Sequence, residues 1–171
     1  MNTDSEYSTI SLNINEEGIM DIEYRWTDGS NEDFRCFYEK TEEYYCKIVG
    51  GISNRSGFVP YNLSASISDV IIAYSDGTAV GCAGLKRYSD ADVEIKRVWV
   101  EPDYRGKKIA TQIMERVEEK ARRMGFKRAI LQTRPIMPDA VGLYEKRGYV
   151  LIDNYPPYDK LEGAICMALN L

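Results

Sequence analysis

The sequence predicts an α/β (α+β) fold in which helices cover both faces of a mixed central sheet. The first observation is an Asp-Gly pair at positions 76 and 77, a strong hairpin signal, between strand-like stretches at residues 70–74 and 78–86. The second is a long amphipathic helical pattern at residues 107–124, which follows a third strand-like stretch at residues 93–100. Three consecutive strands predict an antiparallel meander, and the helix that crosses to a further strand predicts a mixed sheet.

The first third of the chain contributes a strand and a helix. Residues 1–17 are polar and aperiodic, so we expect a loosely ordered arm, with a short strand near residues 9–13. Residues 19–26 alternate apolar and polar side chains, which is typical of a strand, and the turn after them can cap a helix. Aromatic and aliphatic side chains at loosely helical spacing then predict a helix over residues 31–49.

The last third returns to the sheet. Residues 128–133 are compact and apolar enough for a buried strand. Pro138 begins a short helix through Lys146, which Gly148 stops, and the last strands are expected at residues 149–152 and 165–169.

The polar face of the helix at residues 107–124 carries acid-first pairs four residues apart. These pairs are Glu118 with Arg122 and Glu119 with Arg123. We interpret this face as solvated rather than as a binding site.

The composition excludes several kinds of site. The 171 residues contain no histidine, and the four cysteines form no C-x-x-C pair, so we expect neither a metal site nor a disulfide scaffold. No repeat or low-complexity segment divides the chain, which predicts a single domain over residues 1–171. Because the chain has no apolar run of membrane-spanning length and no signal-peptide pattern, we expect a cytoplasmic protein.

Charge is distributed unevenly along the chain. The formal net charge is −5, yet basic residues crowd residues 96–134 while acidic residues crowd residues 1–45. A local basic patch in an acidic protein favours a small anionic ligand over nucleic acid, which needs a broad basic surface. We expect neither nucleic acid nor a membrane as a partner, and the sequence leaves a homodimer open.

The junction between the strand at residues 93–100 and the helix after it is the candidate ligand site. The first N–H groups of a helix have no intrahelical partner, and the helix dipole places about half a positive charge there, so phosphate is attracted. Gly106 lets the backbone approach a ligand closely, and Arg105, Lys107 and Lys108 add positive charge. An ordinary helix start with solvated lysines is the alternative.

Three segments in order resemble the GNAT superfamily of acetyl-CoA-dependent N-acetyltransferases. Residues 105–110 resemble its Q/R-x-x-G-x-G/A pyrophosphate loop, with Lys108 where the family has its first Gly. Residues 80–85 resemble the preceding strand of the family, and residues 140–149 resemble its A-x-x-L-Y-x-K-x-G-F/Y segment. The resemblance covers about residues 70–171.

This resemblance implies acetyl-CoA as the cosubstrate and a GNAT-like topology. The residues it implies for cofactor binding are Val98, Trp99, Val100, Arg105, Gly106, Lys107, Lys108, Ile109 and Ala110. It also implies that Tyr144 is the general acid, because the family's tyrosine at this motif position lies near the cofactor sulfur. A packed aromatic side chain is the alternative for Tyr144.

The lack of an evident activated nucleophile in the sequence favours direct attack by the amine over an acyl-enzyme. Acetyl transfer needs an amine without its extra proton, and a proton for the departing thiolate. The chain has no histidine and no evident nucleophile pair, and Cys82 lies in an interior strand where a cysteine is usually an inert small hydrophobe.

Glu94 is the candidate base, directly or through water. In a regular strand Glu94, Lys96, Val98 and Val100 share one face, while Arg97 lies on the other with Ile95 and Trp99. A bulge, common beside active sites, would change that sorting. A surface glutamate paired with lysine is the alternative interpretation.

The acceptor residues are expected in the first helical region and on the central strands. In the family that helical region borders the acceptor site, which makes Tyr38 and Arg55 candidate substrate contacts, together with Phe34, Tyr45 and Asn54. Lys86, Arg97 and Arg55 are candidates for binding an acceptor carboxylate. The alternatives are core packing for the aromatic residues and solvated charge for the basic ones.

Two functions therefore follow from the sequence. The first is an N-acetyltransferase that acts on a small-molecule or peptide amine. The second is a non-catalytic acyl-CoA or phosphate-binding module with a GNAT-like fold, which Lys108 and Met137, where many relatives have Asn, make conceivable.

Overall fold

The structure, a computed structural model, describes residues 20–55 and 66–171, with the side chains of residues 52 and 55 left out. The arm at residues 1–17 and the strand expected near residues 9–13 lie outside the described residues. In the described part of the chain, no helix is both long enough and apolar enough to cross a bilayer.

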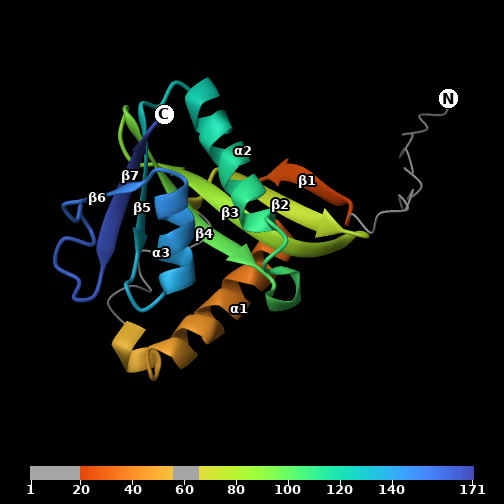
Figure 1. The fold of residues 1–171 in the computed structure, drawn as a ribbon, viewed down its shortest axis with the longest axis horizontal. Coiled ribbons are helices and arrows are strands. Elements are labelled where there is room, and N and C mark those ends of the chain that lie inside the picture. Colours follow the sequence, from red (N-terminus) through yellow and green to blue (C-terminus); the bar gives the residue numbers. More distant parts are fainter. Residues whose placement is uncertain (1–19, 56–65) are drawn as a thin grey trace.

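The described residues form one seven-stranded sheet with helices on both faces (Figure 1). The elements in chain order are β1 (Ile22–Thr27), α1 (Glu32–Ile48), η1 (Ile52–Arg55), β2 (Asp69–Ser75), β3 (Thr78–Arg87), β4 (Asp92–Val100), η4 (Pro102–Tyr104), α2 (Ile109–Arg123), β5 (Arg128–Thr133), α3 (Pro138–Lys146), β6 (Val150–Ile152) and β7 (Ile165–Asn170). The strand order is β1-β2-β3-β4-β5-β7-β6, and β4 with β5 is the parallel pair among the described strands. The predicted mixed sheet with an antiparallel meander is confirmed.

Local sequence accounts for the meander and for the start of α1. Asp76 and Gly77 both have positive φ, +49° and +75°, which a two-residue type I′ hairpin requires. The Asn31 side chain accepts a hydrogen bond from the Phe34 N–H and so caps α1, whereas the turn before it is closed by Asp28, which accepts from the Ser30 N–H. The helix cap is thus Asn31 rather than the preceding turn.

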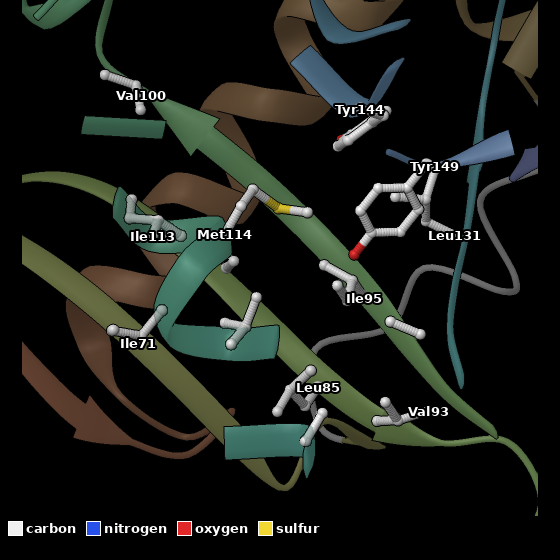
Figure 2. Packing of buried hydrophobic residues seen from close by; sticks show 14 of the residues in the cluster. Ile71, Leu85, Val93, Ile95, Val100, Ile113, Met114, Leu131, Tyr144 and Tyr149 are labelled. Carbon is white, nitrogen blue, oxygen red and sulfur yellow. The ribbon is translucent and has the colours of Figure 1, made fainter. Parts of the chain in front are cut away.

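One layer of the core lies between the sheet and α2. Figure 2 shows Ile113 and Met114 of α2 directed toward the strands that carry Ile71, Leu85 and Ile95. Five members of the predicted apolar stripe of α2 are buried at three- and four-residue spacing, whereas Met124 at its end is 42% exposed: Ile109, Ile113, Met114, Val117 and Ala121. A second cluster on the opposite face packs Phe34 and Phe37 of α1 against β2, β3 and β4. The sheet is therefore covered on both faces.

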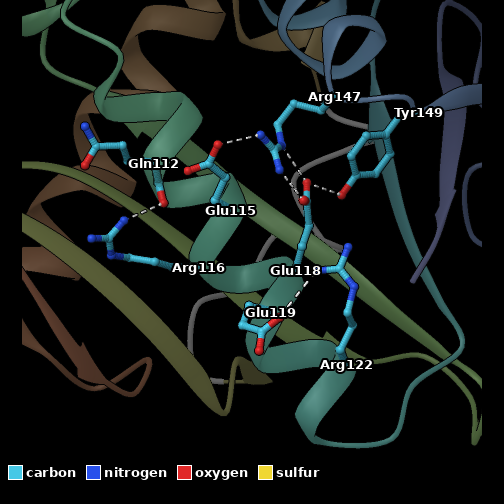
Figure 3. Close-up of polar contacts among 8 residues, drawn as sticks. All are labelled: Gln112, Glu115, Arg116, Glu118, Glu119, Arg122, Arg147 and Tyr149. Atoms are coloured by element: carbon cyan, nitrogen blue, oxygen red, sulfur yellow. Dashed lines mark hydrogen bonds and ion pairs between the residues drawn. The ribbon is translucent and has the colours of Figure 1, made fainter.

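Glu118 corrects one expectation about the polar face of α2. It is 1% exposed, and its carboxylate accepts two hydrogen bonds from the Arg147 guanidinium, at 2.9 and 2.5 Å, and one from the Tyr149 hydroxyl at 3.3 Å (Figure 3). The expected Glu118–Arg122 pair is wrong, because Arg122 instead contacts Glu119 at 3.6 Å. Glu119 also pairs with Arg123 at 2.9 Å, as expected. Buried charge thus joins α2 to the end of α3.

Candidate active site

The site lies where the two central parallel strands separate. β4 and β5 pair over three positions, from Asp92 with Arg128 to Glu94 with Ile130, and no pairing of these strands is present beyond Glu94 in the described chain. A pocket of about 710 Å³ occupies the opening, bounded by the C-terminal turns of α1, by β4, by the start of α2 and by α3. Strand separation therefore gives a passage between the two faces of the sheet.

A β-bulge at Arg97 decides which side chains face each side of this passage. Arg97 has φ +57°, and the β3–β4 register shifts there, with Cys82 opposite Trp99 but Gly84 opposite Lys96. The extra residue reverses the alternation beyond it, so Val98 and Val100 pack with Ile95 on the α2 face. The expectation that they share a face with Glu94 and Lys96 is therefore wrong.

The same bulge turns the other β4 side chains toward α1. Trp99 packs in the cluster on the α1 face, and the Arg97 guanidinium donates to the Glu42 carboxylate of α1 at 2.7 Å. The expectation that Arg97 lies with Ile95 is wrong for the same reason. Lys96 and Glu94 remain on one face, since they precede the bulge and their charged groups meet at 3.3 Å.

The start of α2 has the features of an anion site. The helix begins at Ile109, two residues later than expected, and Lys108 is its N-cap residue in the left-handed conformation, with φ +62°. The Lys108 side chain makes no capping hydrogen bond, and no acidic residue lies in the first turn. The free helix amides are therefore left for an anion, and Gly106, Lys108, Ile109 and Ala110 all line the pocket.

The conformation of Lys108 explains why glycine is the family residue at this position. A side chain in the left-handed region costs about 1 to 2 kcal/mol, which glycine avoids. Lys108 adopts this conformation although it is not glycine.

Lys108→Gly is accordingly expected to raise the free energy of unfolding by about 0.5 to 1 kcal/mol, because the gain in the turn exceeds the added entropy of the unfolded chain. Lys107 is the matched control, since it carries the same charge and its φ is not positive. Lys107→Gly should lower the free energy of unfolding. Chemical denaturation of both variants checks this, and equal effects of the two substitutions would contradict the role of φ.

Of the two basic residues beside Gly106, Arg105 lines the pocket and Lys107 does not. The Arg105 guanidinium donates from Nε to the Val100 carbonyl at 3.0 Å and lies over the Trp99 ring at 4.9 Å, so it buttresses the end of β4 at the pocket edge. The Lys107 ammonium lies over the Tyr104 ring, outside the pocket lining. Val98, Trp99 and Val100 all line the pocket.

Tyr144 reaches the pocket from α3. Its side chain is 7% exposed, and its ring packs against Tyr149 with a centroid separation of 5.9 Å. Burial, with a smaller contribution from Tyr45, raises the pKa of the Tyr144 phenol, so the group remains a proton donor throughout the neutral range. Tyr45 of α1 also lines the pocket.

Glu94 belongs to a buried polar network at the α1 side of the pocket. It is 5% exposed, and its carboxylate accepts from the Tyr155 hydroxyl at 3.1 Å and from the Lys96 ammonium at 3.3 Å. Lys96 also donates to the Tyr158 hydroxyl at 2.7 Å. Burial lowers the pKa of the Lys96 ammonium, and the Glu94 charge offsets part of that effect.

Only some of the residues predicted to bind the acceptor line the pocket. Tyr38 supports Arg97, whose guanidinium lies 4.1 Å from its ring centroid, and neither Tyr38 nor Lys86 belongs to the pocket lining. Arg97 does line the pocket, while the side chain of Arg55 lies outside the described residues. The Cys82 thiol is buried and donates to the Arg97 carbonyl, and burial raises its pKa, which fits an inert cysteine.

Sequence reasoning missed Tyr155, Tyr158 and Arg134. The two tyrosines come from the loop between β6 and β7, and Arg134 directly follows β5. A charged residue at the carboxyl end of a central strand was the available signal for Arg134. The tyrosines had no such signal, because their loop reaches Glu94 only through the tertiary fold.

Comparison with known proteins gives one family match and several relatives. The family described as "Acetyltransferase (GNAT) family" matches residues 19–149. The IAA acetyltransferase of Azospirillum brasilense is 32% identical over 89 residues, which are 52% of this chain and 58% of that protein. An acetyltransferase of the GNAT family from Staphylococcus aureus has a TM-score of 0.69 at 19% identity, and covers 88% of this chain and 99% of its own. A GNAT family acetyltransferase from Elizabethkingia anophelis, with acetyl-CoA bound, has a TM-score of 0.55 at 22% identity, over 66% of this chain and 81% of its own.

These matches differ in extent. The chain spans about half the length of the curated relatives it matches, from 36% to 58%. The solved structures share its fold at low identity. The family match is the broadest in sequence, since it includes the meander, the loop before α2 and the segment that contains Tyr144. The chain belongs to the GNAT family of acetyltransferases.

Proposed function

We propose that this protein transfers an acetyl group from acetyl-CoA to a primary amine. The observation that carries the proposal is the pocket through the sheet, with the α2 N-terminus and Tyr144 on one side and Glu94 on the other. Such a passage lets two substrates reach each other from opposite faces. Acetyl-CoA would supply the activated acetyl group, and residues 105–110 would hold its phosphates.

The reaction assigns one task to each of two side chains. Glu94, directly or through water, takes the proton of the ammonium, and the freed nitrogen attacks the thioester carbonyl carbon. The C–S bond breaks, and Tyr144 donates its proton to the departing sulfur. The acetylated nitrogen loses its second proton to solvent, Glu94 releases its proton to solvent, and Tyr144 is reprotonated from solvent. The products are the N-acetyl amine and CoA with its free thiol, and no acyl-enzyme is formed.

The arrangement of the network is compatible with Glu94 as the base. Tyr155 and Lys96 fix its two carboxylate oxygens from the protein side, and the carboxylate also lines the pocket. Held in this way, the group is oriented before the amine arrives, which is how a positioned base gains its effect.

Glu94→Gln is expected to lower kcat/KM for the amine about 100-fold, because the amide cannot take a proton. The KM for acetyl-CoA should change by less than about twofold, since the phosphate contacts lie on the other face. Steady-state kinetics with varied amine check this.

Glu145→Gln on the exposed surface of α3 is the matched control and should leave both constants unchanged. A rise of more than about tenfold in the KM for acetyl-CoA in Glu94→Gln, or no loss of kcat/KM for the amine, would contradict the assignment.

A thiol-release assay with acetyl-CoA across a panel of amines tests the proposal itself. Release of CoA that depends on an amine is the expected result. Thermal stabilisation by CoA without turnover of any amine would instead favour the non-catalytic CoA-binding module. Calorimetry that detects no CoA binding would reject both functions.

A further inference from the structure

Cationic side chains outnumber carboxylates among the residues that line the pocket. The described cationic side chains that line it are Lys96, Arg97, Arg105, Lys108, Arg134 and Lys146. The carboxylates among the same lining residues are Glu94 and Asp139. Because the whole chain has a net charge of −5, this basic pocket wall is a local feature.

Arg105 and Lys108 belong to the loop that would hold phosphates, so they do not bear on the acceptor. We call Lys96, Arg97 and Arg134 the basic end of the pocket. Lys96 is bonded to Glu94 and Tyr158, and the Arg97 guanidinium pairs with Glu42, so both are held in place by the protein. Their positive charge lies beside the position proposed for the amine.

Arg134 is held at the same end by the loop between β6 and β7. Gly163 of that loop has φ +77°, and a Cβ there would lie 3.0 Å from Arg134 Nη2, so the guanidinium packs directly on the loop backbone. The same loop carries Tyr155 and Tyr158, which bond Glu94 and Lys96. One loop therefore brings Arg134 to the side of the sheet where Glu94 lies.

This arrangement fits a zwitterion better than a polycation. Glu94 offers one carboxylate to an ammonium, while a guanidinium offers two parallel N–H groups to a carboxylate. A polyamine has no carboxylate to offer Arg134, and it would place further positive charge near that guanidinium, where like charges repel.

We propose that the acceptor is an amine that carries a nearby carboxylate, as a free α-amino acid does, and that Arg134 binds this carboxylate. The proposal rests on the acetyl transfer proposed above. It assigns substrate selection to the residue after β5 and to the β6–β7 loop, in addition to α1.

The test compares an amino acid, its carboxamide and spermidine as acceptors for the intact protein, by CoA release at saturating acetyl-CoA. Alanine and alaninamide share one amine and differ in the carboxylate. The amide's amine is less basic and loses its proton more readily, so a preference for the acid must come from the site. We expect kcat/KM for the acid to exceed that for the amide by about 10- to 100-fold.

Arg134→Gln should lower kcat/KM for the acid by about 10- to 100-fold and change that for the amide by less than about twofold. Arg134→Lys, which keeps the charge but not the paired N–H groups, should fall between. Arg35→Gln, the same change at an exposed position in the first turn of α1, is the control and should alter neither substrate. Thermal midpoints show whether each variant is folded.

Preferred turnover of alaninamide or spermidine, or equal loss for acid and amide in Arg134→Gln, would overturn the acceptor class and leave the proposed acetyl transfer standing. Failure of every amine in the wider panel would overturn the acetyl transfer, and this proposal with it.

Discussion

Arg147→Met is expected to lower the free energy of unfolding by about 3 to 5 kcal/mol, because it leaves the buried Glu118 carboxylate without its countercharge. Glu118 is 1% exposed, and Arg147 supplies two of its hydrogen bonds (Figure 3). The remaining donor, the Tyr149 hydroxyl at 3.3 Å, is neutral and cannot compensate for the charge. Chemical denaturation followed by circular dichroism measures the loss.

Two companion variants separate this buried pair from surface charge. Arg122→Met removes a cation that contacts Glu119 at 3.6 Å with 45% of its side chain exposed, and should change the free energy of unfolding by less than about 0.5 kcal/mol. The double variant Glu118→Met with Arg147→Met should recover most of the loss, since no charge remains buried. A loss below about 1 kcal/mol in Arg147→Met would show that Glu118 does not depend on Arg147 for its stability in the folded protein.

Tyr144→Phe is expected to lower kcat about 100-fold and to change the KM for acetyl-CoA by less than about twofold. The substitution keeps the ring, and with it the packing on Tyr149, and removes only the proton that the departing sulfur would receive. Since burial raises the pKa of this phenol, the donor is protonated across the neutral range, and its ionisation should cause no loss of rate between about pH 7 and pH 9. Steady-state kinetics with varied acetyl-CoA measure both constants.

Tyr24→Phe is the matched control, because it removes a tyrosine hydroxyl that donates to Gln112 at 3.0 Å, away from the pocket lining. Its kcat should stay within about twofold of the parent value. An unchanged kcat in Tyr144→Phe would rule out the acid role and leave Tyr144 as a packed aromatic residue.

The two expectations are connected through α3. Arg147 follows α3 directly and is bonded to α2, while Tyr144 lies one turn earlier in α3. The buried pair therefore fixes the tyrosine relative to the helix whose N-terminus would hold the phosphates. Stability and the acid role proposed for Tyr144 would then depend on the same contact between helices.

Periodic and turn signals predicted most of the fold. The Asp-Gly pair at positions 76 and 77 fixed the hairpin because type I′ turns need two positive φ angles. The apolar spacing of α2 predicted its buried face because the helical period leaves few alternatives. Such signals are local, and the sheet then follows from burying those faces.

The arrangement of β4 was not predictable in the same way. A regular strand alternates its faces, and the bulge at Arg97 depends on a non-glycine residue with φ +57° that no local signal marks. It moves Val98 and Val100 to the α2 face and Trp99 to the α1 face. The side chains of β4 beyond the bulge therefore point to the faces opposite to those that regular alternation from Glu94 predicts.

Long-range polar contacts were also missed. Glu118 and Arg147 are 29 positions apart, and Tyr155 reaches Glu94 over 61 positions, so neither pairing follows from helical spacing. Local spacing instead favoured Arg122 as the partner of Glu118. Burial decides between such partners, and burial is a property of the assembled fold.

The most direct measurement of the central claim identifies the product. The protein is incubated with acetyl-CoA and an accepted amine, and mass spectrometry quantifies the acetylated amine, the free CoA and the intact protein. Direct transfer predicts one N-acetyl product for each CoA released and an unmodified protein, also when acetyl-CoA is present without amine. Acetylated protein that passes its acetyl group to the amine, or CoA release without an acetylated amine, would contradict direct transfer at this pocket.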